Sequence, residues 1–400
     1  MKRVLVSQKR ETNGNKTNEG IGNTGVTGSS LRRPVRLWRG GGSDAHDKEL
    51  VFLDGYPERK DDSPWGKAVQ GCAPKGYTIK RQLQDETMNP LTIAVKENNA
   101  PDIAMIDNPS MPTAVDSGMV VDMKEAGVDT SGFDKNIAAP GIIDGKTYGV
   151  SYGVNTLGLY YKPDILQKAG VDPAGIKDWD SLNAAIQKVV QAGFKGISFS
   201  GIATEEGVFQ YLPWFWGAGG DLENPDSQAA QDARDLLSGW VKNGWAPKSS
   251  TTNNQSAAWD VFMSGEYGFA ENGSWQAESA SKKGYGVLSI PAKNGGPAKV
   301  PAGGEFLVLP FHKKGDETKQ KAAAQFLNCL TGRDLLKASE STGYLASKKA
   351  VREQQLKDQA YLQSWDQPAA NAQGRTTRLG LKYENVSSDL SKKLQAALNK

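Results

Sequence analysis

The sequence predicts an α/β protein built from two lobes, and three observations support this class. The chain has 400 residues, which is too long for one ordinary hydrophobic core. Short apolar runs alternate with segments whose apolar residues recur at helical spacing, as in parallel α/β sheets. Hydrophobic residues make up 38% and charged residues 23% of the chain, as in soluble globular proteins. The richest apolar run, residues 306–311, is far too short to span a bilayer.

The first third of the chain predicts strands at residues 50–53, 77–83 and 101–106, and helices at 65–70, 88–98 and from 112. Ligands of parallel α/β sheets bind beyond the carboxyl ends of the strands. Because polar and aromatic side chains stand at those ends, this rule nominates Asp54, Tyr56, Asp107 and Asn108 as ligand-binding residues.

Residues 145–161 hold several glycines and are long for one strand. Two short strands joined by a bend fit better, as where a chain crosses between lobes. Tyr152 and Asn155 lie at this crossing. The alternation then continues, with helices expected at residues 162–169, 179–192, 209–216, 227–242, 257–263, 318–330, 334–340 and 385–398, and strands at 196–200, 267–271, 286–290 and 305–309. We expect an N-terminal lobe from residues 49–154 and 276–340, and a C-terminal lobe from 155–275 and 341–400.

Residues 1–48 differ in composition from the rest, being rich in Gly, Asn, Thr, Ser and Arg without periodicity. Such a segment predicts a disordered leader and tether. Nine basic and two acidic residues give residues 1–40 a charge of +7, whereas the remainder carries −4. The mildly acidic remainder argues against a nucleic-acid surface. The basic head is interpreted as a leader, because no aromatic ladder accompanies it.

Cysteine and histidine are scarce. Cys72 and Cys329 have no CxxC spacing, and His46 and His312 are the only histidines, so neither a metal site nor a cofactor is expected. In an oxidising compartment the two cysteines would be able to form a disulfide. Two unrelated buried thiols are an equally open alternative at this point.

Eight short motifs, in order and in register across residues 49–400, resemble the family-1 solute-binding proteins of bacterial ABC sugar importers, the group that includes maltose-binding protein. They are residues 99–103 (NAPDI), 145–161 (GKTYGVSYGVNTLGLYY), 179–182 (WDSL), 216–220 (WGAGG), 262–266 (FMSGE), 272–275 (NGSW), 303–305 (GGE) and 341–346 (STGYLA). The resemblance implies a periplasmic-binding-protein-like fold of type II, with two α/β lobes joined by a multi-segment hinge and a ligand cleft between them.

The N-terminus departs from that family. The family carries a signal peptide, often ending in a lipid-modified cysteine before a Gly/Ser tether. Residues 40–44 (GGGSD) resemble the tether, but Trp38 and Arg39 stand where the cysteine would be, and no apolar h-region follows Met1. We hypothesise that residues 1–39 arise from a wrong start, a frameshift or cloning. A lipid anchor in the mature protein is an expectation from the resemblance alone.

Aromatic rings and aimed polar groups are what a sugar site needs, because sugars present apolar C–H faces and a rim of hydroxyls. Trp275 follows a strand end where the family pattern reaches the cleft. One of Trp214 and Trp216, on an aromatic-rich helix, is expected to face the cleft. Trp179, Trp240 and Trp259 are assigned to the core. The polar candidates are Glu305, preceded by Gly303 and Gly304, which allow close backbone approach, together with Glu86 and Arg378.

The function indicated is an extracellular, cell-surface or periplasmic binding protein that captures a mono- or oligosaccharide by hinge closure and delivers it to the transmembrane subunits of an ABC importer. We expect a monomer without catalytic activity. A secreted glycoside hydrolase is the rival, since acids and aromatics also serve that chemistry, but the sequence carries no GxSxG, GxxxxGK[ST] or HExxH motif. A second rival is the same fold binding a polyol, a peptide or another non-sugar solute.

Overall fold

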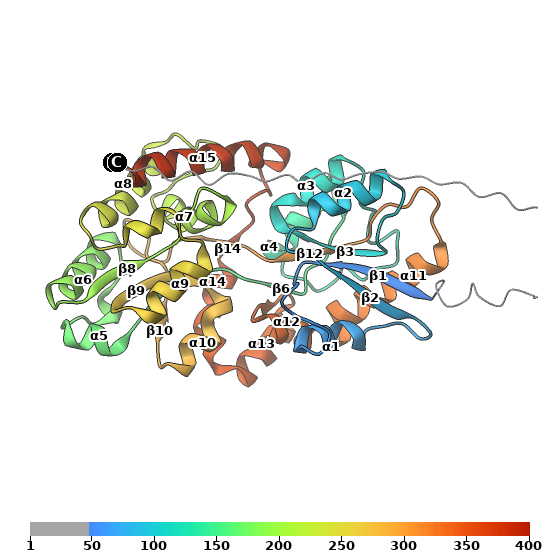
Figure 1. Cartoon of the computed structure of the whole chain (residues 1–400), viewed down its shortest axis with the longest axis horizontal. Helices are drawn as coiled ribbons and strands as arrows, with labels where there is room; N and C mark the ends of the chain where they lie inside the picture. The colour runs from blue at the N-terminus through green and yellow to red at the C-terminus, as the bar shows by residue number, and fades with distance from the viewer. Residues whose placement is uncertain (1–47) are drawn as a thin grey trace, which may run out of the picture. The chain divides into compact units, whose positions relative to one another are not determined.

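The computed structural model describes residues 48–400, which lie within one compact unit. The predicted leader, residues 1–48, falls almost entirely outside the described residues. The first of two four-stranded sheets has the order β12-β3-β1-β2 (Figure 1). Strand β1 is parallel to β2 and β3, whereas β12 runs antiparallel to β3. The strands are β1 (Glu49–Asp54), β2 (Thr78–Leu83), β3 (Ile103–Asp107) and β12 (Glu305–Val308).

We define lobe one as this sheet together with the helices that share its hydrophobic core. Phe52 of β1, Trp65 and Phe326 are all fully buried in that core. Ser63 caps the first helix by accepting the backbone N–H of Gly66, and Pro64 suits the first helical position. The helices are α1 (Pro64–Gly71), α2 (Met88–Lys96), α3 (Met111–Asp116), α11 (Glu317–Asn328) and α12 (Leu335–Thr342).

Lobe two is built on the second sheet, with the order β10-β7-β9-β8. Strand β9 is fully buried along its length and pairs parallel with β8 and antiparallel with β7. Trp179, Trp240 and Trp259 lie in its core, as predicted. The strands are β7 (Leu157–Tyr161), β8 (Lys195–Ser198), β9 (Tyr267–Gly273) and β10 (Gly286–Leu288); the helices are α5 (Pro163–Lys168), α6 (Trp179–Gln191), α7 (Glu205–Gly217), α8 (Gln228–Lys242), α9 (Gln255–Ser264), α10 (Ala277–Lys282), α14 (Asp366–Ala370) and α15 (Tyr383–Leu398).

The boundary expected at residue 276 needs correction. Strand β10 pairs with β7 of lobe two, and Ala277, Ile290 and Val300 are buried in the core of that lobe. The chain therefore returns to lobe one only at about residue 305, where β12 begins. Residues 341–346 also pack partly on lobe one, through Tyr344 and Ala346. Short strands give little periodicity, so the sequence did not reveal to which sheet β10 belongs.

The chain crosses between the lobes three times, before β7, before β12 and after α12. Short antiparallel and parallel pairs tie the crossing segments together: β6 pairs with β13, β11 pairs with β14, and Asn155 bridges to Gly303. The bend predicted within residues 145–161 is thus confirmed. The remaining elements are β4 (Ile142–Ile143), β5 (Lys146–Thr147), β6 (Gly153–Val154), β11 (Val300–Pro301), β13 (Leu345–Ala346), β14 (Ala372–Gln373), α4 (Lys135–Ala138) and α13 (Lys349–Asp358).

Cys72 and Cys329 form a disulfide, which decides between the two alternatives left open by the sequence. Cys72 directly follows α1 and Cys329 directly follows α11, with their Cα atoms 5.5 Å apart. The bond therefore links two helices of lobe one across 257 residues of sequence.

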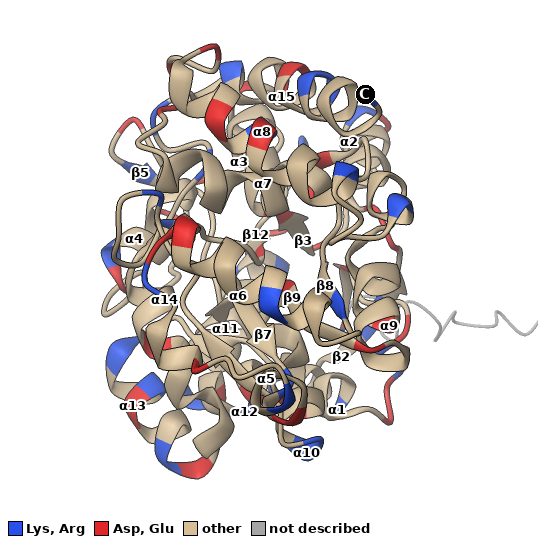
Figure 2. Cartoon of the chain, turned by 90° about the vertical axis from the view of Figure 1, so that its left-hand side faces the viewer, with Lys and Arg blue, Asp and Glu red and all other residues tan. Residues whose placement is uncertain are grey.

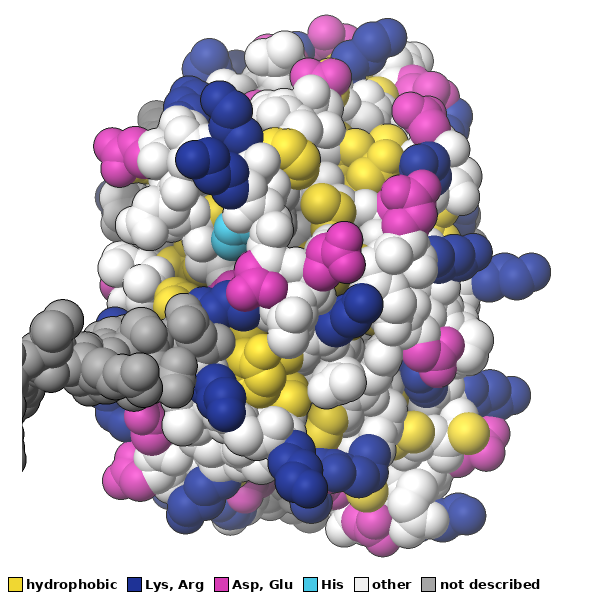
Figure 3. All heavy atoms as spheres, turned by 90° about the vertical axis from the view of Figure 1, so that its right-hand side faces the viewer, with side chains coloured by type: hydrophobic (Ala, Val, Ile, Leu, Met, Phe, Trp, Pro, Cys, Tyr) yellow, Lys and Arg dark blue, Asp and Glu magenta, His cyan; other side chains and the backbone are white. Residues whose placement is uncertain are grey.

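The surface of the described chain mixes both signs of charge. Basic and acidic residues lie interspersed along the ribbon at one end of the molecule (Figure 2), and basic and acidic side chains lie interspersed over the surface of the opposite end (Figure 3). Within residues 48–400, no helix combines the length and apolarity that crossing a membrane would require.

Candidate functional site

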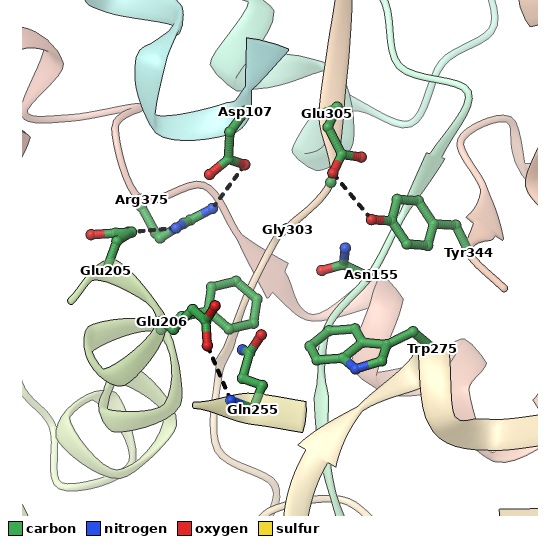
Figure 4. Close-up of a pocket in the computed structure, with 12 residues that line it drawn as sticks. Asp107, Asn155, Glu205, Glu206, Gln255, Trp275, Gly303, Glu305, Tyr344 and Arg375 are labelled. Atoms are coloured by element: carbon green, nitrogen blue, oxygen red, sulfur yellow. Dashed lines mark hydrogen bonds and ion pairs between the residues drawn. The ribbon is translucent and has the colours of Figure 1, made fainter. Parts of the chain in front are cut away.

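A cavity of about 340 Å³ lies where the two lobes and the crossing segments meet (Figure 4). We call it the interlobe cavity. Its wall combines carboxylates, amides and aromatic rings. The lining residues are Asp107, Asn155, Glu205, Glu206, Phe209, Gln255, Trp275, Gly303, Gly304, Glu305, Tyr344 and Arg375.

Lobe one contributes two carboxylates from adjacent strands. Asp107 ends β3 and Glu305 begins β12, and the antiparallel register places the two residues directly opposite each other. Side chains at such positions are close neighbours. Desolvation in the cavity wall raises the pKa of Glu305, and the neighbouring Asp107 carboxylate adds to the shift, while hydrogen bonds from tyrosines oppose it. The rule on carboxyl ends therefore applies to Asp107, whereas Glu305 reaches the same edge of the sheet from the start of an antiparallel strand.

Three tyrosines hold Glu305. The hydroxyl of Tyr56 donates to Oε2 at 2.5 Å, that of Tyr152 to the same oxygen at 3.2 Å, and that of Tyr344 to Oε1 at 3.3 Å. The rings of Tyr152 and Tyr344 are stacked, with an interplanar angle of 8°. Burial raises the pKa of Tyr56 and Tyr152 well above the ordinary range, so both hydroxyls remain donors. Glu305 is thereby fixed in one orientation.

Lobe two contributes the first turn of α7. Glu205 and Glu206 begin this helix, and acidic residues are favourable beside the positive end of a helix dipole. Phe209 follows one turn later on the same face and also lines the cavity. Glu206 accepts the backbone N–H of Gln255, the first residue of α9, at 3.0 Å. Two helix starts therefore converge on one wall.

Arg375 follows β14 and connects the walls of the two lobes. Its guanidinium forms an ion pair with Glu205 of lobe two and lies 3.9 Å from Asp107 of lobe one. It also lies over the ring of Phe209, 4.8 Å from the centroid. Only 3% of the side chain is exposed. Burial lowers the pKa of Arg375, but Tyr383 and the carboxylates of Glu205 and Asp107 outweigh this effect and raise the pKa overall. It remains a cation.

Trp275 covers the opposite side of the cavity. It sits in the turn that follows β9, and its indole ring lies across the backbone of Gly273. A methyl group at Gly273 would come 2.0 Å from that ring. The absence of a side chain at Gly273 is therefore what allows the indole to lie flat at the cavity wall.

Gly303 and Gly304 are required by the crossing itself. A Cβ at Gly303 would lie 2.0 Å from Oδ1 of Asn155, and Gly304 has φ of +105°, which disfavours other residues. Asn155 and Gly303 also exchange backbone hydrogen bonds. These glycines thus hold two crossing segments in contact as well as bordering the cavity.

Six of the residues nominated from the sequence line the cavity: Asp107, Asn155, Trp275, Gly303, Gly304 and Glu305. Tyr56 and Tyr152 stand directly behind Glu305, both buried. The structure therefore brings these eight residues together.

Asp54, Glu86 and Asn108 lie away from the cavity wall. The carboxylate of Asp54 is completely buried and accepts from Arg81 Nε at 2.7 Å, Trp65 Nε1 at 2.9 Å and the N–H of Tyr56. Glu86 is exposed and accepts the backbone N–H groups of Met88 and Asn89, at the start of α2. Asn108 is buried in the turn after β3. These three residues therefore lie outside the lining of the interlobe cavity, and their contacts support the fold around it.

Trp214, Trp216 and Arg378 also lie outside the lining of the interlobe cavity. Trp214 is fully buried and donates its indole N–H to Glu271 at 3.0 Å, so it belongs to the core of lobe two. Trp216 and Arg378 border a different cavity of about 760 Å³ near β11 and β14. Arg378 is exposed and pairs with Asp221 at 2.7 Å and with Glu223. Neither tryptophan of α7 faces the interlobe cavity, because Phe209 takes that position.

Six lining residues were missed. Tyr344 was in a quoted motif but was not nominated, and Arg375 lies three residues before the arginine that was chosen. Glu205 and Glu206 had a usable signal, since paired acids at a helix start near an aromatic run mark a wall of the cleft. Phe209 and Gln255 had none. The missed residues are Glu205, Glu206, Phe209, Gln255, Tyr344 and Arg375.

Known proteins resemble this chain in sequence and fold. A putative binding protein of Brucella abortus is 27% identical over 174 residues, covering 40% of this chain and 41% of that protein. The maltodextrin-binding protein of Bacillus subtilis is 26% identical, covering 61% of this chain and 60% of that protein. The chain thus aligns with about two fifths to three fifths of the length of these curated relatives.

A solved structure shows the same fold. The GacH receptor of Streptomyces glaucescens, determined unliganded and with acarbose, superposes with a TM-score of 0.74 at 20% identity, covering 88% of this chain and 93% of that one. The strand orders of both sheets and the three crossings therefore belong to the two-lobed periplasmic-binding-protein fold of type II.

The family profile described as "Bacterial extracellular solute-binding protein" matches residues 72–369. This span includes most of both sheets, the three crossings and eleven of the twelve residues that line the cavity. The twelfth, Arg375, lies six residues after the end of the span. The chain belongs to the bacterial extracellular solute-binding protein family.

Proposed function

We propose that this protein captures a carbohydrate in the interlobe cavity and delivers it to the transmembrane subunits of an ABC importer. The observation that carries the proposal is the composition of the cavity wall. Trp275 and Tyr344 offer aromatic surface, while Asn155, Gln255 and the carboxylates offer hydrogen-bonding groups at the edges. This combination suits C–H faces and hydroxyls at once. The sugar-binding relatives and the acarbose-binding receptor are consistent with it.

The mechanism we propose is hinge closure. Asp107 and Glu305 belong to lobe one, and Glu205, Gln255 and Trp275 belong to lobe two, so a bound ligand would touch both. A ligand that gains contacts only when the lobes are together shifts the population toward the closed form. The importer would then recognise that closed form. We further propose a monomer that acts outside the cytoplasmic membrane, at the cell surface or in the periplasm, with a lipid anchor as the means of retention.

Calorimetry with a panel of mono-, di- and oligosaccharides tests the proposal. At least one sugar should bind and raise the melting temperature, because it stabilises only the folded state. Trp275→Ala should weaken that binding by about 1–3 kcal/mol, the scale for a buried aromatic contact. Trp245→Ala, a partly buried tryptophan outside the cavity wall, is the matched control and should retain the affinity.

Gly273→Ala sharpens the test. The added methyl must displace the indole of Trp275 without removing it, so the affinity should fall although the aromatic group is present. If both Trp275→Ala and Gly273→Ala bind the sugar as tightly as the parent protein does, the wall formed by Trp275 is not part of the binding site. Turnover of chromogenic glycosides at enzyme-like rates would instead favour a hydrolase.

A further inference from the structure

The charges that line the interlobe cavity are unbalanced. Four carboxylates, from Asp107, Glu205, Glu206 and Glu305, face one guanidinium, from Arg375. Figure 4 shows Asp107, Arg375 and Glu205 gathered at one side, with Glu206 next to them and Glu305 across the cavity. The wall therefore carries an excess of negative charge.

Arg375 is already committed within the protein. It pairs with Glu205, approaches Asp107 and covers Phe209, with 3% of its side chain exposed. Glu205 also accepts the hydroxyls of Tyr383, at 2.6 Å, and Ser387. An anionic ligand would have to break these contacts to reach the guanidinium. Breaking a buried ion pair leaves an uncompensated charge, which is costly.

Two carboxylates have no cationic partner in the part of the chain that the structure describes. Glu206 is exposed to the cavity and accepts a backbone N–H of Gln255. Glu305 accepts tyrosine hydroxyls, which are neutral. A further guanidinium, that of Arg59, lies over the ring of Tyr56 and donates to the carbonyl oxygens of Ser341 and Thr342. Neither carboxylate is therefore neutralised by a cation within the described residues.

The aromatic side of the cavity is compatible with a cation as well as with a sugar ring. Trp275 and Tyr344 lie opposite Arg375 in Figure 4, and both ring types attract ammonium groups through their faces. A ligand ammonium placed between these rings and the two carboxylates would meet attractive groups on each side.

We propose that the preferred ligand is an amine-bearing carbohydrate, whose ammonium group pairs with Glu206 while Glu305 adds negative charge from across the cavity, and that the cavity rejects anionic sugars. This proposal rests on the proposed function, because it specifies the chemical class of sugar that the same cavity accepts. A cleft lined by one sign of charge favours a ligand of the other sign.

Matched ligands test the charge preference by isothermal titration calorimetry of the full chain. The probes are D-glucosamine, D-glucose and D-glucuronate, and the β-1,4-linked glucosamine disaccharide with cellobiose. Measurements at pH 6.5 keep the amine protonated, since such amines titrate at about 7.7–8.0. The amino sugars should bind at least tenfold more tightly than the neutral partners, and glucuronate more weakly than both. The advantage should shrink when the salt concentration rises from 50 to 500 mM.

The variant Glu206→Gln should lower the ratio of amino-sugar to neutral-sugar affinity at least fivefold. Its side chain is exposed and glutamine retains an oxygen for the N–H of Gln255, so the fold is not at risk. Glu305→Gln should lower the ratio further. Glu317→Gln, an 88% exposed acid on α11, is the matched control and should leave the ratio unchanged.

The outcomes separate the two proposals. Neutral sugars that bind as tightly as their amino partners would overturn the charge preference and leave sugar binding intact. Tighter binding of glucuronate would do the same. If no probe of any charge binds, both proposals fall.

Discussion

Asp54 and Asp107 end neighbouring strands of the same sheet, yet they stand in opposite environments. The Asp54 carboxylate is completely buried against Arg81 and Trp65. The Asp107 side chain is 55% exposed, lines the interlobe cavity and lies 3.9 Å from Arg375. Both satisfy the rule that ligands bind beyond the carboxyl ends of strands. The difference lies in their neighbours: α1 covers the end of β1, whereas the end of β3 opens toward lobe two. Position nominates a residue, and the packing around it decides its role.

The largest effect is expected from Asp54→Ala. Removing this carboxylate leaves the Arg81 guanidinium, 1% exposed, with only the exposed partner Asp61. The free energy of unfolding in urea should fall by about 3–5 kcal/mol, the scale for breaking a buried pair. Asp107→Ala should lower it by less than about 1 kcal/mol, since its ion pair is long and partly solvated, but should weaken ligand binding. Similar stability losses in both variants would remove the contrast.

Removing the disulfide tests whether the cluster around Asp54, formed with Arg81 and Trp65, serves only the stability of the fold. Cys72 follows the helix that carries Trp65, a partner of Asp54. Replacing both cysteines by serine should lower the free energy of unfolding by about 2–4 kcal/mol, because the bond closes a long loop. The ligand affinity of the folded protein should stay the same. A large loss of affinity at temperatures where the variant is folded would show that the cluster around Asp54 also shapes the cavity.

A third carboxylate, Glu271, sharpens the comparison because it is buried like Asp54 but lacks a cation among the described residues. It is completely buried in β9, its Oε2 accepts from Trp214, and burial raises its pKa well above the ordinary value. The unfolded chain loses this proton near its ordinary pKa of about 4.3, while the folded chain keeps it. Stability should therefore fall as the pH rises above that value, by at most about 1.4 kcal/mol per pH unit.

Glu271→Gln removes this titration. The free energy of unfolding, measured by denaturation at several pH values between pH 4 and pH 7, should change less with pH in the variant than in the parent protein. The difference between the two should grow toward pH 7. Parallel pH profiles would mean that Glu271 is ionised in the folded protein. Asp54→Asn should show a smaller effect of the same sign, because burial also raises the pKa of Asp54 while the Arg81 guanidinium opposes the shift.

Much of the fold was predictable because its signals are local. Helices such as α6 and α8 show an apolar stripe that recurs every three to four residues, and β9 is a continuous buried run. The assignment of residues 276–301 to lobe one was wrong because partner choice is not local. Strand β10 has three residues, and its pairing with β7 depends on a contact more than a hundred residues away. The cysteine pairing was equally invisible, since 257 residues separate its ends.

The candidate site was predictable where backbone geometry dictates it. Strand ends and glycine pairs pointed to Asp107, Glu305 and Gly303, which converge in the structure. Arg375 was missed in favour of Arg378, because two arginines three residues apart in one loop carry no signal that tells the buried one from the exposed one. Trp214 was nominated for its ring, but the rotation of α7 turns it into the core. Side-chain direction on a wholly buried helix is set by packing, which sequence periodicity does not record.

Lobe one is assembled from two stretches of chain separated by nearly all of lobe two. Its core joins Phe52 and Met105 to Phe306 and Leu327, so its sheet lacks an outer strand until β12 has been synthesised. Contacts of such long sequence separation slow folding. A growing chain that has reached residue 150 therefore holds three of the four strands of this sheet, with one edge of β3 unpaired. Lobe two, whose sheet is contained within residues 157–288, has all its strands earlier and is the natural first structure to condense.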